Sequence, residues 1–448
     1  MRNIMKKRIL PLLAVLAAPA LCLAKGANPL NLQTELSHPL LPSGEKQKAY
    51  LKVSITGGEA PAQEERAPIN VAIVLDRSSS MSGEKIARAR DAAKLAIARL
   101  HSNDTVSVIS YDSVVEVLVP ATKLTDKDFV YKAIDKITSR GSTALFAGVS
   151  KGAEELRKFK NEEAVNRVIL LSDGQANVGP KSPLELGELG RSLAKEGISV
   201  TTIGLGSGYN EDLMNKLALN SDGNHSFVET PGELAQVFDQ ELGGLASVVA
   251  QNITFTVELA EGIRPVRSLG RESNIVGQTV TVTFNQLYAE QNKFLLLEVE
   301  TPNLESEQDQ LVAKAEVNYF DLSTNKTTKI ATQSVARYTN DKALVEKSAN
   351  REVMIAVVDF IANEKNLAAV QLRDEGKIKE AKQALEGNAF YLQENAVKWS
   401  SEELEVEAAL NIDDSAKIDT AEWGFKRKSM TQRQNEKVTQ NRAYRTKD

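Results

Sequence analysis

A carboxylate and a row of hydroxyls follow one apolar stretch of this sequence. The apolar run 70–75 ends at Asp76, and Ser78 and Ser80 follow at alternate positions. Residues two apart in an extended turn point to the same side, so these three side chains are expected to face one point. Carboxylate and hydroxyl oxygens are ligands for hard cations. The alternative is that Asp76 and the serines cap the helix predicted to begin near Gly83, a common role of both residue types.

A second carboxylate and a further hydroxyl are predicted at the same place. The apolar run 166–172 ends at Asp173, as the earlier run ends at Asp76, and Thr143 begins a predicted helix between them. Gly141, just before Thr143, lets the backbone approach closely. In a doubly wound parallel sheet, ligands bind outside the carboxyl ends of the strands. Five side chains are therefore expected to converge at one sheet edge: Asp76, Ser78, Ser80, Thr143 and Asp173.

The predicted ligand set consists of oxygens alone, and it is small. It favours Mg²⁺, with Mn²⁺ or Ca²⁺ as alternatives, because a Ca²⁺ site usually has about six to eight oxygen ligands. Two carboxylates at most balance the charge of a divalent ion, and the hydroxyls are neutral. A coordination position left open would then accept a carboxylate from another protein, so that the ion bridges the two proteins.

The elements that must position these side chains alternate between strands and helices from residue 69 to residue 249. Such an order is typical of a parallel sheet with helices on both faces. Strands are predicted at 70–75, 105–111, 114–119, 166–172, 198–204 and 224–228, and helices at 84–101, 126–138, 144–160, 184–196, 210–220 and 231–247. The second and third strands are joined too closely for a crossover helix, so one edge strand should run antiparallel.

The pattern changes twice after this domain. Short, β-branched, turn-bounded segments predict a small antiparallel sandwich over 250–340. The lone strand at 49–56 is expected to join it, with the doubly wound domain inserted between, because an isolated strand cannot pair alone. Helical periodicity over 341–400 predicts a hairpin that breaks at Gly376. Part of it is weakly similar to a tetratricopeptide-type unit, but simple packing is favoured over a peptide-binding groove.

The predicted fold class is therefore α/β, with a doubly wound, mostly parallel sheet inserted in or followed by an antiparallel β-sandwich, and a C-terminal helical hairpin. The predicted parts are a signal peptide (1–24), an N-terminal strand segment with a linker (25–68), the doubly wound domain (69–249), the sandwich (250–340), the hairpin (341–400) and a polar, basic, disordered tail (401–448). The tail is interpreted as solvated, with contact to an anionic membrane as the alternative.

The beginning of the sequence predicts export. Basic residues precede an apolar run from Ile9 to Leu23, which is the layout of a secretory signal and is short for a membrane span. Cleavage after Ala24 would remove Cys22, the only cysteine, so no disulfide is expected in a bacterial periplasm or at the cell exterior. An uncleaved anchor is the alternative. The net charge of -5 over 448 residues argues against a nucleic-acid partner.

The five oxygen-bearing residues resemble the metal-ion-dependent adhesion site of the von Willebrand factor type A domain, a D-x-S-x-S string with a distant Thr and Asp. The resemblance covers residues 69–249 and implies that the five are metal ligands, directly or through water. Ser79 departs from the family pattern, which usually has Gly there. The wider order of β-structure, α/β domain, β-structure and helices resembles bacterial exported proteins related to inter-alpha-trypsin-inhibitor heavy chains.

These patterns favour a non-enzymatic, exported adhesion or scaffold module that binds an Asp or Glu of a protein partner through Mg²⁺. A metal-assisted hydrolase would need a general base beside the ion, and no His or Lys is expected there. An envelope structural protein with a vestigial metal site is the third interpretation. Surface or capping roles are assigned to His38, His101 and His225, and Asp104 and Asp112 are interpreted as turn carboxylates.

Overall fold

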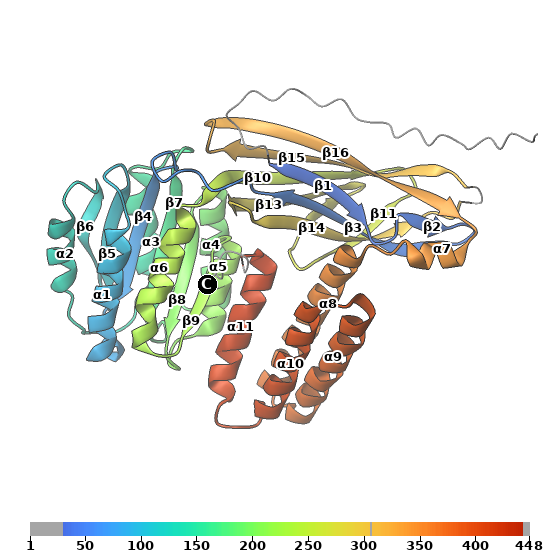
Figure 1. Ribbon diagram of the computed structural model, residues 1–448. Coiled ribbons are helices and arrows are strands. Elements are labelled where there is room, and N and C mark those ends of the chain that lie inside the picture. Colours follow the sequence, from blue (N-terminus) through green and yellow to red (C-terminus); the bar gives the residue numbers. More distant parts are fainter. Residues whose placement is uncertain (1–29, 305–306, 442–448) are drawn as a thin grey trace, which may run out of the picture.

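The computed structural model describes residues 30–304 and 307–441. The predicted signal peptide lies outside these residues. The described chain forms an α/β domain, a β-sandwich beside it, and a group of helices that lies below the sandwich in Figure 1. None of the helices within the described ranges is long and apolar enough to cross a membrane.

The α/β domain is built on a sheet with the strand order β6-β5-β4-β7-β8-β9. The strands are β4 (Ile69–Asp76), β5 (Thr105–Tyr111), β6 (Val115–Lys123), β7 (Val165–Ser172), β8 (Ser199–Leu205) and β9 (His225–Val228). All neighbours are parallel except β5 and β6, which confirms the predicted antiparallel edge strand. The helices are α1 (Glu84–Ala98), α2 (Lys127–Asp135), α3 (Leu145–Arg157), α4 (Pro183–Lys195), α5 (Glu211–Asn220) and α6 (Leu234–Leu245).

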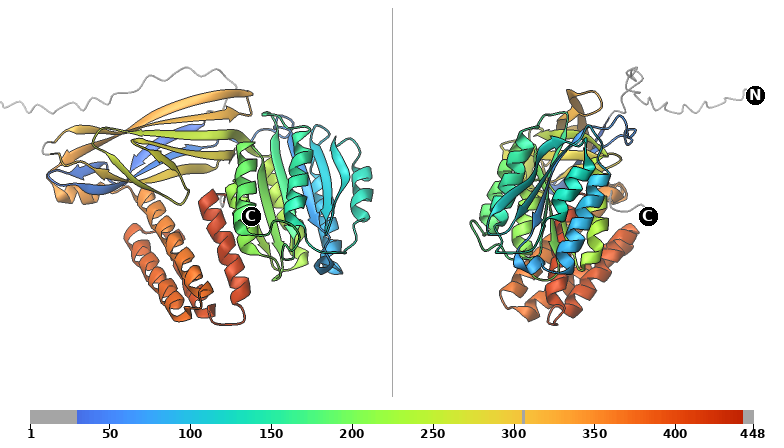
Figure 2. Two further views of the ribbon diagram at one scale, coloured as in Figure 1. Left: turned by 180° about the vertical axis from the view of Figure 1, so that it is seen from behind. Right: turned by 90° about the vertical axis from the view of Figure 1, so that its left-hand side faces the viewer.

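Helices cover both faces of this sheet because its strands are apolar on both sides. Alternate residues of β4 point to opposite faces. Val71 and Ile73 pack in the core formed with α1, α2 and α6, whereas Ala72 and Val74 pack in the core formed with α3, α4 and α5. The two helical layers are seen edge-on in Figure 2. The doubly wound arrangement predicted from the sequence is thus confirmed.

The sandwich is made of two sheets, with the orders β1-β3-β14-β11 and β12-β13-β10-β15-β16-β2. Its strands are β1 (Asn31–Leu36), β2 (Leu40–Pro42), β3 (Gln47–Thr56), β10 (Val248–Leu259), β11 (Arg264–Leu269), β12 (Asn274–Val276), β13 (Thr279–Tyr288), β14 (Asn292–Thr301), β15 (Asp309–Asp321) and β16 (Lys326–Thr339). β3 pairs with β14 along its whole length. The α/β domain is therefore inserted into the sandwich, as predicted for the lone strand at 49–56.

The amino ends of two strands of the α/β sheet face the sandwich. At the start of β7, the Arg167 guanidinium donates to the Tyr288 hydroxyl at 2.9 Å. At the start of β8, the Ser199 hydroxyl accepts from the Asn285 side-chain amide at 3.1 Å. Because these strands are parallel, their carboxyl ends lie at the opposite edge of the sheet, away from the sandwich.

The C-terminal region contains more ordered structure than the predicted hairpin. After the short α7 (Lys342–Lys347), the helices are α8 (Arg351–Asp374), α9 (Ile378–Trp399), α10 (Glu402–Lys417) and α11 (Trp423–Thr439). The prediction of a disordered tail over 401–448 is therefore wrong over 402–439. α10 begins at a Ser401 cap and buries Leu404 and Ala408 against α8 and α9.

α11 was not predicted because its buried face is mostly polar. It lies along the edge strand β9, beside the α/β domain in Figures 1 and 2. The side-chain oxygens of Gln432 and Asn435 accept from the backbone N–H groups of Phe227 and His225, at 2.7 and 3.2 Å. These contacts satisfy the hydrogen-bonding groups of an open sheet edge. They do not require an apolar stripe along the helix, and an apolar stripe is what sequence periodicity detects.

Candidate metal-binding site

The two predicted carboxylates end adjacent parallel strands. Asp76 is the last residue of β4, and Asp173 follows β7 directly. The register of the two strands pairs Leu75 with Leu171, so both carboxylates reach the same edge of the sheet. Both are buried: Asp76 is 0% exposed and Asp173 is 2% exposed. The site lies at the carboxyl edge, where a doubly wound sheet binds ligands.

A chain of hydrogen bonds joins the two carboxylates through the predicted serines. Asp76 Oδ1 accepts from the Ser78 backbone N–H at 2.7 Å, and Asp76 Oδ2 accepts from the Ser172 hydroxyl at 2.6 Å. The hydroxyls of Ser78 and Ser80 lie 3.0 Å apart. The Ser80 hydroxyl in turn donates to Asp173 Oδ1 at 2.6 Å. Four of the five predicted residues therefore form one connected group of oxygens.

Thr143 completes the group from the loop before α3. It is 3% exposed, and its N–H donates to the Asn177 side-chain oxygen at 2.8 Å. A Cβ added to Gly174 would lie 3.2 Å from the Ser80 hydroxyl oxygen and 3.4 Å from that of Thr143. The two hydroxyls thus border the same small space, which Gly174 leaves open. All five predicted side chains come together at this edge.

Ser79 anchors the loop of Ser78 and Ser80 to the loop of Thr143. Its N–H and its hydroxyl both donate to the Gly141 carbonyl, at 3.1 and 3.0 Å. Gly141 has φ +71, a conformation that favours glycine. Where the family usually has Gly, this chain therefore has a hydroxyl that adds a hydrogen bond between the two loops.

Asp112, directly after β5, connects the same two loops through hydrogen bonds. The sequence analysis did not predict this role. It is 2% exposed, and one oxygen accepts from Arg77 at 2.8 Å and from Arg140 at 3.0 Å. Arg77 and Arg140 flank the loops that carry the predicted ligands. The available signal was that Asp112 also follows a buried strand, as Asp76 and Asp173 do. The predicted turn role is also present, because the other oxygen of Asp112 accepts from the Val114 N–H at 2.9 Å in the turn between β5 and β6; the prediction missed only the two arginines.

Lys85 is a further neighbour that the sequence analysis did not predict. Its ammonium, at the start of α1, forms an ion pair with Asp173 Oδ2. The Lys85 side chain is 36% exposed, whereas that of Asp173 is 0% exposed. The expectation that no lysine lies beside the site is therefore wrong. The sequence feature that could have indicated this contact is the position of Lys85, nine residues after Asp76 in the first turn of the predicted helix.

The electrostatics of the site leave Asp76 without a cationic partner. No Lys, Arg or His within the described ranges forms an ion pair with Asp76. Burial raises the pKa of its carboxyl to about 6, and hydrogen bonds from Ser172 and Ser78 act in the opposite direction. Burying a carboxylate is unfavourable unless a charge compensates it. A divalent ion between Asp76 and Asp173 would supply that charge.

The capping alternative for these residues is wrong. The N-cap of α1 is Gly83, with φ 74 and no side-chain capping hydrogen bond. Ser78 precedes a short 3₁₀ helix, Ser79–Met81, also without a side-chain cap. Asp76 bonds the N–H of Ser78 and the Ser172 hydroxyl rather than the first turn of α1. The serines and Asp76 are thus directed at one another and at Asp173.

The donor set fits a hard cation. No cluster of three or more His, Cys, Asp or Glu side chains suited to a metal occurs among the residues that the structure describes. An ion at this edge would instead rely on two carboxylates and three hydroxyls, a set typical of Mg²⁺ sites that retain water. The Lys85 ammonium would have to leave Asp173 or share it with the ion.

The histidine assignments need one correction. His225 is 0% exposed, and its ring lies 2.9 Å from the Thr202 hydroxyl. A surface role for this residue is therefore wrong, because β9 is covered by α11. The ring is distant from the five predicted ligands in the sheet order, since β8 separates β9 from β7.

Comparison with known proteins identifies the α/β domain. The profile of the von Willebrand factor type A domain matches residues 70–240. The uncharacterized protein sll0103 of Synechocystis sp. is 27% identical over 297 residues, which cover 64% of this chain and 69% of that protein. Inter-alpha-trypsin inhibitor heavy chain H3 of Rattus norvegicus is 27% identical over 215 residues, or 46% of this chain and 24% of that protein.

The fold has also been observed in solved structures. A von Willebrand factor type A protein from Catenulispora acidiphila superposes with a TM-score of 0.68 at 16% sequence identity. The superposition covers 88% of this chain and 91% of that protein. At this identity the likeness concerns the fold alone. The matched profile and the arrangement of strands and helices lead to one conclusion: residues 70–240 form a von Willebrand factor type A domain.

Proposed function

We propose that this chain is an exported protein-binding module that holds Mg²⁺ between Asp76 and Asp173 and uses it to bind an acidic side chain of a partner. The observation that carries the proposal is the hydrogen-bonded group of Asp76, Ser78, Ser80 and Asp173, with Thr143 beside it. Two carboxylates balance the charge of the ion, and neutral hydroxyls do not reduce its attraction for a further anion.

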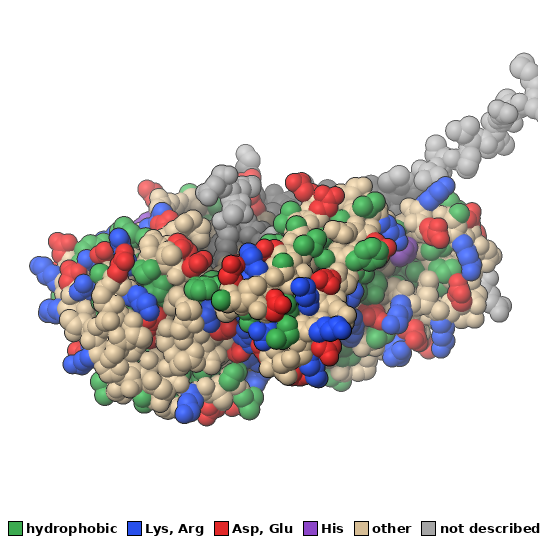
Figure 3. Space-filling model, turned by 90° about the horizontal axis from the view of Figure 1, so that it is seen from below, with side chains coloured by type: hydrophobic (Ala, Val, Ile, Leu, Met, Phe, Trp, Pro, Cys, Tyr) green, Lys and Arg blue, Asp and Glu red, His purple; other side chains and the backbone are tan. Residues whose placement is uncertain are grey.

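The position of the site supports binding to a large partner. The carboxyl edge of the sheet faces away from the sandwich, and Ser79 and Ser80 are exposed there. Figure 3 views the molecule from below, and acidic and basic side chains are interspersed on that face. A specific contact at this edge would then depend on the ion rather than on a broad field of one charge. Such a field is what a nucleic-acid partner would need.

Binding is favoured over hydrolysis by the surroundings of the ion site. Lys85 pairs with Asp173 as an ammonium, and an ammonium has no lone pair with which to accept a proton. Within the described residues, none of the side-chain hydrogen bonds of the five predicted ligands involves a histidine. A general base would have to be supplied by the partner or the substrate. Hydrolysis of phosphate or acyl esters by the purified Mg²⁺-loaded protein would contradict this part of the proposal.

The test combines metal titration with partner capture. Mn²⁺ binding, followed by electron paramagnetic resonance with Mg²⁺ as competitor, should show one site per chain in the wild type. Asp76→Ala should weaken this binding at least about tenfold, and so should the milder Ser80→Ala at an exposed position, because each removes an oxygen ligand of the group. Asp91→Ala, which removes an exposed carboxylate of α1 (59% exposed), is the matched control and should bind normally.

Partner capture uses the same variants. Proteins retained from envelope extract in Mg²⁺ should be released by chelator and absent with Asp76→Ala, while circular dichroism shows an intact fold. Wild-type protein that binds no divalent ion, or Asp76→Ala protein that retains the same partner, would refute the proposed function.

A further inference from the structure

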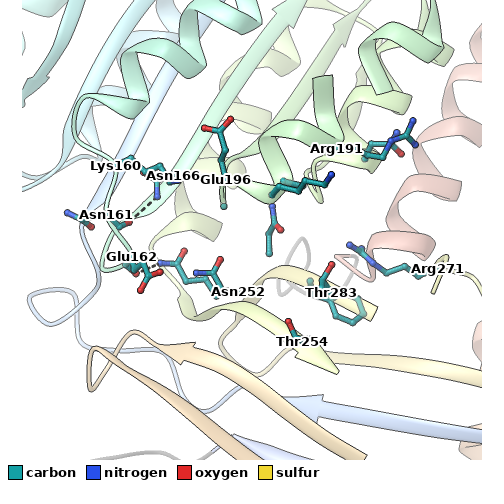
Figure 4. Close-up of a pocket in the computed structure, with 17 residues that line it drawn as sticks. Lys160, Asn161, Glu162, Asn166, Arg191, Glu196, Asn252, Thr254, Arg271 and Thr283 are labelled. Carbon is teal, nitrogen blue, oxygen red and sulfur yellow. Dashed lines mark hydrogen bonds between the residues drawn. The ribbon is translucent and has the colours of Figure 1, made fainter. Parts of the chain in front are cut away.

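A polar cavity of about 570 Å³ lies between the α/β domain and the sandwich (Figure 4). The α/β domain contributes the segment 160–162 after α3, and the end of α4 with the turn before β8. The sandwich contributes β10, β13 and Arg271. This place is at the amino ends of β7 and β8, so it is separate from the metal-site edge at their carboxyl ends.

The base of the cavity is preformed. Asn166 is 3% exposed and Gln251 is 4% exposed. The Asn166 amide donates to the Ala164 carbonyl at 2.9 Å, and the Gln251 amide donates to the Glu162 carbonyl at 2.6 Å. Gln251 thereby connects β10 of the sandwich to the α/β domain. A cavity with walls fixed by buried hydrogen bonds needs little reorganisation to bind a ligand.

The charges that line the cavity are unbalanced toward positive. Of its two carboxylates, Glu196 is already held by Arg157, at 2.8 and 2.9 Å. Arg191 and Lys195 lie one helical turn apart near the end of α4, and within the described residues neither forms an ion pair or a side-chain hydrogen bond. Figure 4 shows Lys160 and Arg191 on two sides of the space. The full charged lining is Lys160, Arg191, Lys195 and Arg271 against Glu162 and Glu196. Arg271 is paired with Asp222, so Lys160, Arg191 and Lys195 are the cations that form no ion pair within the described residues.

The sandwich wall supplies neutral hydrogen-bonding groups. Thr254 of β10 and Thr283 of β13 are directly paired across the strands, so their side chains lie next to each other on one face. Asn252 lies at a bulge of β10 with φ 56. A Cβ added to Gly197 would lie 3.4 Å from the Asn252 side-chain oxygen, so this side chain reaches the turn before β8. Bulges re-aim side chains in this way. None of these three side chains donates or accepts a hydrogen bond within the described part of the chain.

From this lining we infer that the cavity binds a small anionic polyol, a molecule with a phosphate or carboxylate group at one end and several hydroxyls. The unpaired cations bind the anionic group, and Asn252, Thr254 and Thr283 bind the hydroxyls. The volume lies in the range of roughly 300–1,000 Å³ typical of small-molecule sites, and exceeds what an inorganic anion fills. An apolar ligand is disfavoured, because the one aromatic residue, Phe284, is 1% exposed and lies under the Arg271 guanidinium.

The test uses isothermal titration calorimetry on the full chain with a chelator present, so that no metal-bound anion contributes. The probes are glucose 6-phosphate, gluconate, glucose and inorganic phosphate. Glucose 6-phosphate or gluconate should bind at least about tenfold more tightly than both glucose and inorganic phosphate, because charged and neutral groups act together. The tighter of the two anions identifies the charged group. Equal binding of inorganic phosphate, or no binding of either anionic polyol, would overturn the inference.

Variants locate the binding. Lys195→Gln should weaken the binding of the anionic polyol about tenfold, and Lys132→Gln, with the same change of charge on the exposed surface of α2, should not. Thr283→Val should weaken the same ligand while leaving the strand intact, since Val favours strands. Asp76→Ala should bind as the wild type does, which separates this site from the proposed metal site. Unchanged binding in both cavity variants would place the ligand elsewhere and refute the inference.

Discussion

Asp222 joins the α/β domain to the sandwich through a buried cluster of charges. It follows α5, and its carboxylate accepts from the Arg271 guanidinium at 2.6 Å and from the Asn285 backbone N–H at 2.5 Å. The Lys293 ammonium lies 3.8 Å away. Asp222 and Lys293 are both 1% exposed in this contact. All three partners belong to the sandwich, so the replacement Asp222→Asn removes the charge that holds the two parts together.

The size of the effect follows from the environment of this carboxyl. Burial alone would raise its pKa, but Arg271, Lys293 and the Asn285 N–H lower the pKa from 3.8 to about 2. A shift of that size is worth about 2 kcal/mol of stability. Since the pKa is lowered in the folded state, this contribution is present above about pH 4 and is lost as the pH falls toward 2. Asp222→Asn also leaves the buried Lys293 ammonium and the partly exposed Arg271 guanidinium unpaired, so the expected loss at pH 7 is about 3–5 kcal/mol.

The assay is urea unfolding of wild type and Asp222→Asn at pH 7, 4.5 and 3. The difference in the free energy of unfolding should be large at pH 7 and shrink at pH 3. At pH 3 the carboxyl of the unfolded chain, with its ordinary pKa of 3.8, is largely protonated, so part of the stabilisation by the lowered folded-state pKa is lost. The control Asp239→Asn removes a carboxylate that is 43% exposed and pairs with Arg99 at the surface, so it should change stability by less than about 1 kcal/mol. A loss below about 1 kcal/mol for Asp222→Asn at pH 7, or a loss independent of pH, would refute this reasoning.

Two further predictions concern lysines with buried partners. Lys85→Met should tighten divalent-ion binding about tenfold in the Mn²⁺ titration, because the ammonium no longer competes with the ion for Asp173. The control Lys94→Met, on the same helix, should leave the affinity unchanged. Weaker ion binding by Lys85→Met would show that Lys85 supports the site instead. Lys428→Met should speed amide hydrogen exchange in α11, because it removes the ion pair between the buried Lys428 ammonium and Glu211. Exchange as slow as in the wild type would mean that the other polar contacts suffice to hold the helix.

Much of the fold could be predicted because it depends on local patterns. Apolar runs that end in polar residues located β4 and β7, and helical periods located α1 to α6 within a few residues of their observed ends. The convergence of Asp76 and Asp173 follows from parallel strands alone, since their carboxyl ends share one edge. Even the insertion of the domain into the sandwich could be inferred, because an unpaired β3 would be unstable.

The composition and order of residues therefore determined the fold class and the place of the five oxygen-bearing side chains. Tertiary structure alone decided the polar contacts between distant segments: Lys85 with Asp173, Asp112 with two arginines, and α11 with the edge strand β9. The physical reason is that hydrophobic periodicity is repeated along the chain and can be read locally. A buried polar contact depends instead on one partner brought from a distant segment, and no local pattern specifies that partner.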